Sequence, residues 1–450
     1  MRHVRPARRY RRGRALLGGA CVLGAQALLL AHCGGEDTSA AAALRPGLDD
    51  DAQGIPPDGG SEYALPEYPR AITPCRVLAT QEVGSGSAGA ARRSALHALG
   101  AGYAFVYFEG SQGLIHSTSF DLLGHTALTE PLVHPPAGTE PSHLNLYLQD
   151  EQLHVAYSVL RPHLRRVVRH LAFQREDAEE VASLSGHAQQ LHVTSAYGDR
   201  QPLFAWQQMP VSGTGAFVVF DQGQQPTSYE TLTDETHTLA LPQWVASADG
   251  EPDAPNLSFV QLGADGEVTL KVRAFDGSAT EGELTVEDGI QHLEGTPTAV
   301  AFFRGELGTL HVWAERNEAR TVLRAKHVDP KGLSPFGLRS IGSARGRVTL
   351  SQPRLLAFGQ AVLLFYVARQ VLEDGATLYS VRQQMLHAWG EPLDRHDEVI
   401  LATSNEPIMH LTVAKGPQVG WAALAFDTFQ TEDERRQPVF VALSCSETAN

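Results

Sequence analysis

The sequence lacks the short motifs that mark common active sites. It contains no G-x-S-x-G, H-E-x-x-H or G-x-x-x-x-G-K-[ST] pattern. These patterns would supply an activated serine, a pair of zinc-binding histidines or a phosphate-binding loop. It also has no paired carboxylates in a recognisable setting. We therefore expect a non-enzymatic role and no cofactor.

Basic charge is scarce outside the extreme N-terminus. The formal net charge is −15, although the segment 1–14 carries seven arginines and no acid. When residues 1–32 are set aside, 29 of the 36 basic residues remain against all 51 acidic ones. Such an acidic chain repels the phosphate backbone, so nucleic acid is not an expected partner.

The N-terminus has the pattern of an export signal. The arginine-rich residues 1–14 precede an apolar stretch, 15–32, whose length fits both a signal peptide and a marginal membrane span. The sequence Leu30-Ala31-His32-Cys33-Gly34-Gly35 then resembles the lipobox of bacterial lipoproteins. Leu30, Ala31 and Cys33 fit that pattern, whereas His32 replaces the small residue that normally precedes the cysteine.

This resemblance implies that residues 1–32 are removed and that the Cys33 thiol is acylated, which would anchor the protein in a membrane of the cell envelope. An uncleaved anchor helix and ordinary signal cleavage remain alternatives, and the body is exported in each case. Residues 33–72 are acidic and rich in Pro and Gly, and we expect a flexible tether there. The folded body is then 73–446, followed by a short tail, 447–450.

Long amphipathic helical patterns are also missing, and short strand patterns recur instead. Apolar second strands recur at nearly regular intervals, with turn formers between them. Regularly spaced short strands with turns are typical of a sandwich, barrel or propeller, and a repeat of about fifty residues favours the propeller. The aligned second-strand positions are Tyr107, Tyr157, Trp206, Phe259, Trp313, Tyr366 and Leu424. We expect these side chains to pack between blades.

The strand count predicts how the body closes. The last repeat offers only three strands, whereas residues 75–82 precede the first complete repeat and have no blade of their own. Pairing that stretch antiparallel with the last strand places Cys75 beside Cys445. Export permits a disulfide between them; the alternative is two unpaired buried thiols. The expected fold is all-β, a seven-bladed β-propeller whose N-terminal strand completes the last blade.

The repeat resembles seven-bladed β-propellers in general over residues 75–445. It matches no named subclass, because the Trp-Asp dipeptide of WD40 blades, the Gly-Gly pair of kelch blades and the aspartate box of sialidases are absent from it. Since propellers host unrelated functions, the resemblance implies a fold and no particular activity.

Histidine is the residue type that suggests a specific site. Six histidines fall at or just before predicted first strands, which would line a central channel: His97, His143, His192, His237, His292 and His410. His143, His192 and His410 each lie at the same distance before an aligned second-strand position. Imidazoles converging there could bind a transition metal. The alternative is that they hydrogen-bond loop backbone.

Together these observations predict an exported, lipid-anchored β-propeller that acts as a binding or scaffold module in the cell envelope. Its partner would be an envelope protein or a glycan, in addition to the membrane. The alternative hypothesis is a propeller-fold hydrolase or lyase that acts on polysaccharide.

Overall fold

The described part of the chain belongs to the unit Pro46–Asn450. The computed structural model describes residues 72–88, 94–110, 114–133, 141–149, 152–161, 164–171, 179–182, 187–193, 202, 204–210, 217–221, 229–232, 237–245, 256–263, 268–274, 286–292, 296–305, 308–316, 320–329, 334–358, 361–393, 398–431 and 434–446. The predicted signal peptide, Cys33, the tether before Ile72 and the tail lie outside these residues.

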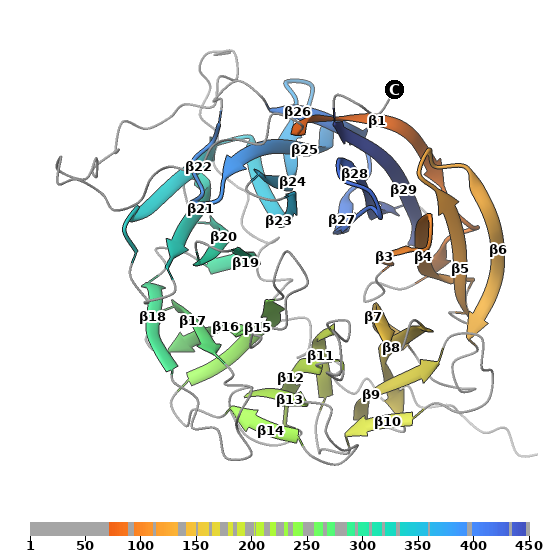
Figure 1. Cartoon of the computed structure of the whole chain (residues 1–450), viewed down its shortest axis with the longest axis horizontal. Coiled ribbons are helices and arrows are strands. Elements are labelled where there is room, and N and C mark those ends of the chain that lie inside the picture. Colours follow the sequence, from red (N-terminus) through yellow and green to blue (C-terminus); the bar gives the residue numbers. More distant parts are fainter. Residues whose placement is uncertain are drawn as a thin grey trace, which may run out of the picture. The chain divides into compact units, whose positions relative to one another are not determined.

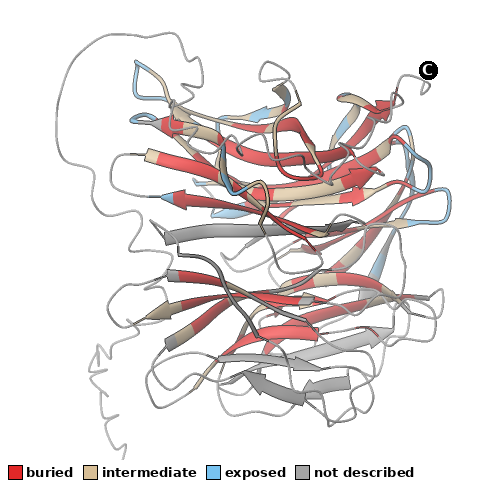
Figure 2. Ribbon diagram, turned by 60° about the vertical axis from the view of Figure 1, so that its left-hand side comes forward, coloured by how far each residue is buried: buried red, intermediate tan, exposed pale blue. Residues whose placement is uncertain are grey.

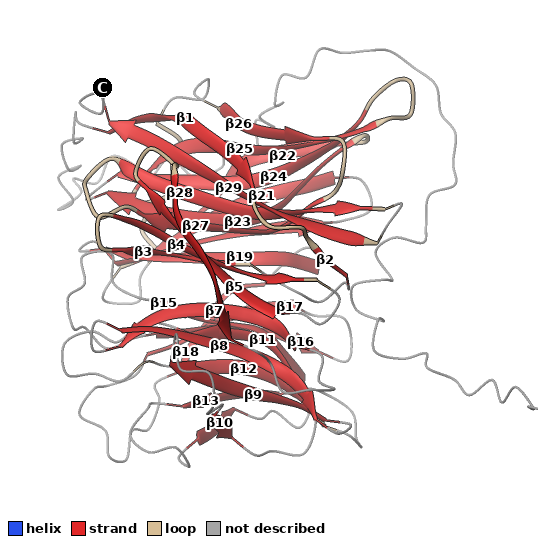
Figure 3. Cartoon of the chain, turned by 90° about the vertical axis from the view of Figure 1, so that its right-hand side faces the viewer, coloured by secondary structure: helices blue, strands red, loops and turns tan. Residues whose placement is uncertain are grey.

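The regular elements are all β-strands, and no described residue is helical (Figure 3). Accordingly, no helix in the described ranges is long and apolar enough to cross a membrane. The all-β prediction is confirmed, because the short apolar runs and closely spaced turns that repeat along the sequence suit strands and leave no room for helices.

The described strands form seven antiparallel sheets. The first four follow one another along the chain: β3 (Ala95–Leu99), β4 (Gly102–Glu109), β5 (Leu114–Asp121) and β6 (Thr126–Val133); β7 (Pro141–Gln149), β8 (Gln152–Arg161), β9 (Leu164–Leu171) and β10 (Glu179–Ala182); β11 (His187–Val193), β12 (Phe204–Met209), β13 (Phe217–Asp221) and β14 (Tyr229–Leu232); β15 (His237–Val245), β16 (Asn256–Gly263), β17 (Val268–Ala274) and β18 (Val286–His292).

Two more sheets continue this order, and the seventh combines both ends of the folded region. They are β19 (Thr296–Gly305), β20 (Gly308–Arg316), β21 (Arg320–Val328) and β22 (Leu338–Arg345); β23 (Val348–Phe358), β24 (Ala361–Val371), β25 (Thr377–His387) and β26 (Val399–Ser404); and β27 (Ile408–Lys415), β28 (Trp421–Gln430), β29 (Arg435–Ser446) and β1 (Ile72–Glu82), with β2 (Ser87–Ala88) also paired to β29.

Figure 1 shows the sheets following one another around a common centre, with one strand of each sheet innermost: β3, β7, β11, β15, β19, β23 and β27. We call these innermost strands the first strands. Each first strand contacts the first strand of the next sheet, and β27 contacts β3 in the same way. The core lies between neighbouring sheets, where clusters of buried residues combine strands of two sheets (Figure 2). Apolar burial against both neighbours is what holds each sheet in place.

The aligned second-strand positions lie in this core. Each has at most 5% of its surface exposed: Tyr107, Tyr157, Trp206, Phe259, Trp313, Tyr366 and Leu424. The two tryptophans also find polar partners on their own strands. Trp206 Nε1 donates to Gln208 Oε1 at 2.9 Å, and Trp313 Nε1 donates to Glu315 Oε1 at 2.6 Å. The predicted packing role of these positions is confirmed.

The seventh sheet is completed by the N-terminal strand. β1 pairs antiparallel with β29, from Ile72 opposite Ser446 to Glu82 opposite Val439. A disulfide joins Cys75 to Cys445, whose Cα atoms are 4.0 Å apart across a sequence separation of 370 residues. Both cysteines are buried. This is the pairing that the strand count predicts.

The same strand also contacts the sheets on both sides. The Cys75 N–H donates to Gln383 Oε1 in β25 at 3.0 Å. At the other end of β1, Gln81 Nε2 donates to the carbonyl of Gly124, and Gln81 Oε1 accepts from Thr126 Oγ1 at 2.9 Å. β1 therefore links three consecutive sheets, although it belongs to only one of them.

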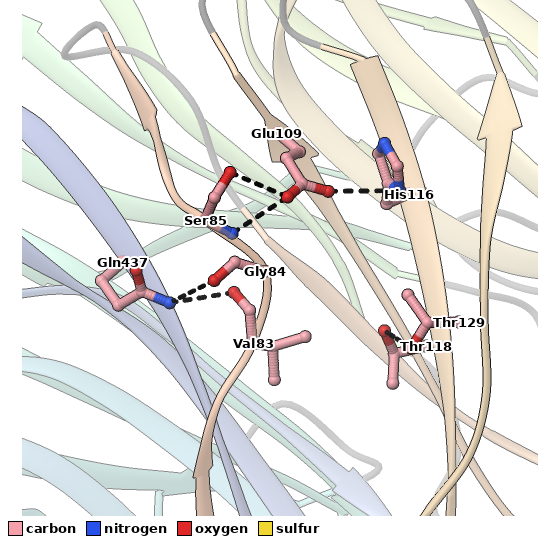
Figure 4. A network of polar contacts seen from close by, with 8 residues as sticks. All are labelled: Val83, Gly84, Ser85, Glu109, His116, Thr118, Thr129 and Gln437. Atoms are coloured by element: carbon pink, nitrogen blue, oxygen red, sulfur yellow. Dashed lines mark hydrogen bonds and ion pairs between the residues drawn. The ribbon is translucent and has the colours of Figure 1, made fainter.

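A short hook, Val83–Gly86, carries the chain from β1 toward the first sheet (Figure 4). Gln437 Nε2 donates to the carbonyls of Val83 and Gly84 at 3.0 and 3.2 Å. Gly84 has a φ of +68°, and a Cβ there would lie 2.6 Å from the Tyr107 ring, so this position requires glycine. The hook is thus fastened to the seventh sheet while it packs against the first.

Glu109 fastens the hook from the side of the first sheet. Its Oε1 accepts from the backbone N–H and the hydroxyl of Ser85 at 3.0 and 2.8 Å, and its Oε2 lies 3.3 Å from His116 Nδ1 (Figure 4). Partial burial raises the pKa of Glu109, but the two Ser85 hydrogen bonds and the His116 charge outweigh it, and the pKa is lowered overall. The carboxylate form is the one that holds the hook.

Candidate functional site

The innermost strands carry a repeated irregularity. In β7, β11, β15, β19, β23 and β27 the register with the second strand shifts, as at a β-bulge. Five of the six described non-glycine residues with left-handed φ lie at these shifts: His143, Gln190, Leu241, Gln352 and His410, with φ between 52° and 56°. A non-glycine residue in this conformation costs roughly 1–3 kcal/mol, and such residues are often found at functional sites.

The bulge side chains tie neighbouring sheets together. Gln352 Oε1, in β23, accepts from the Leu411 N–H in β27 at 2.9 Å, and its Nε2 donates to the Ile408 carbonyl at 3.0 Å. Gln190 Oε1, in β11, accepts from the Leu241 N–H in β15 at 2.7 Å. The left-handed backbone aims each amide across to the next bulge.

A third link of this kind comes from the second sheet. Asn145 Nδ2, in β7, donates to the Leu191 carbonyl in β11 at 3.1 Å and to the His143 carbonyl at 2.9 Å. The links therefore run from β7 to β11, from β11 to β15 and from β23 to β27. These side chains hydrogen-bond to backbone groups near the bulges, where pairing between strands is interrupted. This accounts for the polar residues at these positions.

His143 lies at a bulge and contacts serines of its own sheet. Its Nδ1 is 3.0 Å from Ser142 Oγ and 2.9 Å from Ser158 Oγ, and the two hydroxyls are 2.8 Å apart. Both serines are fully buried. A serine in that position is inaccessible to a substrate, so this Ser–His contact holds the bulge in shape and does not form a nucleophile.

His410 occupies the matching place in the seventh sheet, where the partners are charged. Its Nδ1 is 3.2 Å from Asp427 Oδ2 and 2.9 Å from the Arg436 guanidinium. Asp427 and Arg436 are 3% and 2% exposed, and the guanidinium also lies 5.8 Å from the centre of the Phe429 ring. Asp427 pairs with Met409, the residue before His410, just as Ser158 pairs with Ser142, the residue before His143. The two histidines therefore occupy equivalent positions, but His143 contacts hydroxyl groups and His410 contacts charged groups.

His192 does not occupy the matching place, and its predicted equivalence with the other two histidines is wrong. Gln190 is the left-handed residue of β11, whereas His192 follows the bulge and pairs with Ala205. The common spacing misleads because positions 194–203 all separate β11 from β12, whereas only 150 and 151 separate β7 from β8. Because the number of residues between the first and second strands differs among the sheets, equal spacing in the sequence does not give equivalent positions on the strands.

The three candidate ligands belong to three different sheets. Among the described residues, no group of three His, Cys, Asp or Glu side chains could hold a metal ion. His292 also differs from its predicted place, because it ends β18, the fourth strand of its sheet. His97 lies in the first strand β3, where burial lowers its pKa and its Nδ1 is 2.6 Å from the Ala98 carbonyl.

The innermost strands contain no acidic residue. Asp and Glu are absent from β3, β7, β11, β15, β19, β23 and β27 as the structure defines them. Glycoside hydrolysis normally requires two carboxylates on either side of the scissile bond. The innermost strands supply no such pair.

Sequence reasoning missed two groups of buried polar side chains. One is the Asp427–Arg436 pair beside His410. The other is His311 and His327, on β20 and β21, which are 1% and 2% exposed. Burial first, and then the charges of His327 and Lys326, lower the pKa of His311 to about 3. Alternation along the strand could not have identified His311, because β20 is buried at consecutive positions from Thr309 to Glu315.

Comparisons with known proteins give a fold likeness only. No protein-family model matches the chain, and no curated protein matches it in sequence. A thermostable family-43 glycoside hydrolase superposes with a TM-score of 0.36 at 10% identity, covering 58% of this chain and 92% of its own. Levansucrase of Bacillus subtilis gives 0.36 at 7% identity, covering 58% and 88%.

A prolyl endopeptidase covers more of this chain, 80%, but only 46% of its own length, with a TM-score of 0.46 at 14% identity. These similar proteins have different activities by name. At such identities and TM-scores the likenesses do not identify an activity for this chain.

Proposed function

We propose that the body is a seven-bladed β-propeller, closed by its N-terminal strand, that serves as a binding module in the cell envelope. The observation that carries this proposal is the composition of the innermost strands. They have no carboxylate, and their described polar side chains at the bulges are engaged within the fold, with neighbouring sheets for Asn145, Gln190 and Gln352 and within their own sheets for His143 and His410. A rigid ring of this kind presents its loops to a partner.

Export and lipid anchoring are part of the same proposal. The lipobox-like sequence at Cys33 supports acylation, and the disulfide between Cys75 and Cys445 suits an oxidising compartment outside the cytosol. The partner is an envelope protein or a glycan that meets the body at its loops.

The second candidate is a propeller-fold enzyme that acts on polysaccharide. The names of several similar structures, among them an arabinanase and a levansucrase, fall in this class. The comparisons agree better with this candidate than with a binding module, whereas the strand composition favours the binding module.

Turnover and binding measured on the same preparation separate the two candidates. We expect the purified full chain to retain a glycan or an envelope protein on a column without releasing new reducing ends from arabinan, levan or peptidoglycan. Release of reducing ends that grows in proportion to protein concentration would overturn the binding module in favour of the enzyme. A mock purification from cells that do not express the chain serves as the control for a contaminating hydrolase.

A further inference from the structure

Three hairpin turns from neighbouring sheets lie together at one end of the innermost strands. They follow β23 at Phe358, join β27 to β28 over 415–421 and join β3 to β4 over 99–102, and positions 359 and 360 lie outside the described residues. Lys415 Nζ is 5.5 Å from the centre of the Phe358 ring, which brings the first two turns together. A Cβ on Gly416 would lie 2.6 Å from the Tyr103 hydroxyl, which brings the second beside the third. We call these three segments the turn cluster.

The turn cluster contains no acidic residue and exposes two large apolar side chains. Val419 is 70% exposed, more than any other large hydrophobic side chain in the described residues, and Leu99 is 37% exposed. The three segments read FGQA, KGPQVGW and LGAG, with Lys415 as their one charged residue. The corresponding connections of the other four sheets all contain carboxylates: Asp150 and Glu151; Asp199; Asp249, Glu251 and Asp253; Glu306. In a chain of net charge −15, the absence of acid from the turn cluster is distinctive.

The N-terminal part of the chain joins the body beside the turn cluster. β1 starts at Ile72, opposite Ser446. The neighbouring Cys445 N–H donates to the Gly420 carbonyl at 2.6 Å, which places the end of β29 against the central turn of the cluster. The first described residue, Ile72, therefore lies at the end of β29 that contacts the turn cluster.

We propose that the turn cluster rests on the bilayer that holds the acylated Cys33. This inference rests on the proposed lipid anchoring. The residues between Cys33 and Ile72 would span roughly 130 Å if fully extended, so the anchor alone does not determine which side of the body meets the membrane. Val419 and Leu99 enter the interfacial region, and Lys415 approaches anionic headgroups. The acid-bearing connections of the other four sheets are disfavoured there, because anionic headgroups repel carboxylates.

Tryptophan placed at two exposed apolar positions tests this orientation. Val419→Trp lies in the turn cluster, and Ile400→Trp lies on β26, where Ile400 is 57% exposed. Full-length protein is taken from membranes and reconstituted into vesicles of zwitterionic and anionic phospholipid that carry brominated acyl chains. Bromine quenches indole only at close range. We expect the added fluorescence of Val419→Trp to be quenched about twofold more than that of Ile400→Trp, and Lys415→Glu to reduce the difference.

Equal quenching at both positions, in protein whose Cys33 carries acyl chains by mass spectrometry, would overturn the inference and leave the lipid anchor intact. If Cys33 carries no lipid, the proposed lipid anchoring is refuted, and the orientation of the turn cluster needs a separate test. The same quenching comparison is then made with the chain added to vesicles from solution. Stronger quenching at position 419 would still support the membrane-facing turn cluster, and equal quenching would refute it.

Discussion

Gln352 and Leu411 lie 59 residues apart in the sequence, yet the side-chain oxygen of Gln352 accepts the backbone N–H of Leu411 at 2.9 Å. The same amide donates to the Ile408 carbonyl. One side chain thus satisfies two backbone groups of the next sheet. It does so from a left-handed backbone, at a φ of 53°.

Shortening this side chain should destabilise the fold. Gln352→Asn keeps an amide that tolerates left-handed backbone but does not reach β27, so Leu411 N–H and Ile408 O lose their partner. Each unsatisfied group costs about 1–3 kcal/mol, and we expect a loss of about 2 kcal/mol in the free energy of unfolding. Chemical denaturation measures it. Gln418→Asn, at an exposed turn glutamine, is the matched control, and equal midpoints for the two variants would contradict the role of the link.

Removing the disulfide should loosen the seventh sheet first. Cys75→Ser/Cys445→Ser removes a cross-link over 370 residues, and such a change typically costs about 2–5 kcal/mol. Because β1 is held afterwards only by hydrogen bonds and packing, we expect amides of β1 to exchange hydrogen faster than those of β24. Hydrogen exchange followed by mass spectrometry makes the comparison. Uniform acceleration across all strands would mean that β1 is no separate closing element.

His311 should make the fold sensitive to acid. Its pKa is about 3 in the folded protein, against an ordinary value near 6.5 when unfolded. As the pH falls below 6.5, His311 therefore binds a proton in the unfolded chain but stays neutral in the folded chain. This contribution to stability is fully present above that pH and is lost progressively on acidification.

Between pH 7.5 and pH 5.5 this histidine alone should lower the free energy of unfolding by about 1.4 kcal/mol. His311→Gln should flatten that part of the pH profile, whatever it does to stability at neutral pH. An identical slope for wild type and His311→Gln would show that other groups cause the acid sensitivity.

Glu109 should hold the hook through its charge. Glu109→Ala removes the acceptor of both Ser85 hydrogen bonds, whereas Glu109→Gln keeps an acceptor and loses the pairing with His116. Since the carboxylate is partly exposed, we expect about 1 kcal/mol for Glu109→Ala and less for Glu109→Gln. Because the pKa of Glu109 is lowered on folding, the advantage of wild type over Glu109→Gln should disappear as the carboxylate is protonated in acid, since the neutral carboxyl keeps an acceptor as the amide does. A difference between wild type and Glu109→Gln that does not shrink on acidification would contradict a charge-based role.

The sequence predicted the architecture better than the site. Alternating apolar patterns set the strands, and their spacing placed Trp206 and Trp313 in the core because packing between sheets repeats along the chain. Cys75 and Cys445 followed from counting strands. The bulges did not follow, since the left-handed position of Gln190 depends on register with β12 and not on spacing along the chain. The burial of Arg436 beside His410 could not be predicted from the sequence either, because these residues come together only when β27, β28 and β29 pair.

The most direct test of the account is the mass of the N-terminal peptide of the protein isolated from membranes of cells that export it. We predict a chain that begins at Cys33, carries acyl groups on that residue and retains the Cys75–Cys445 bond under non-reducing conditions. A chain that still contains residues 1–32, or one with an unmodified Cys33, would contradict the proposal that this body is held at the envelope by lipid.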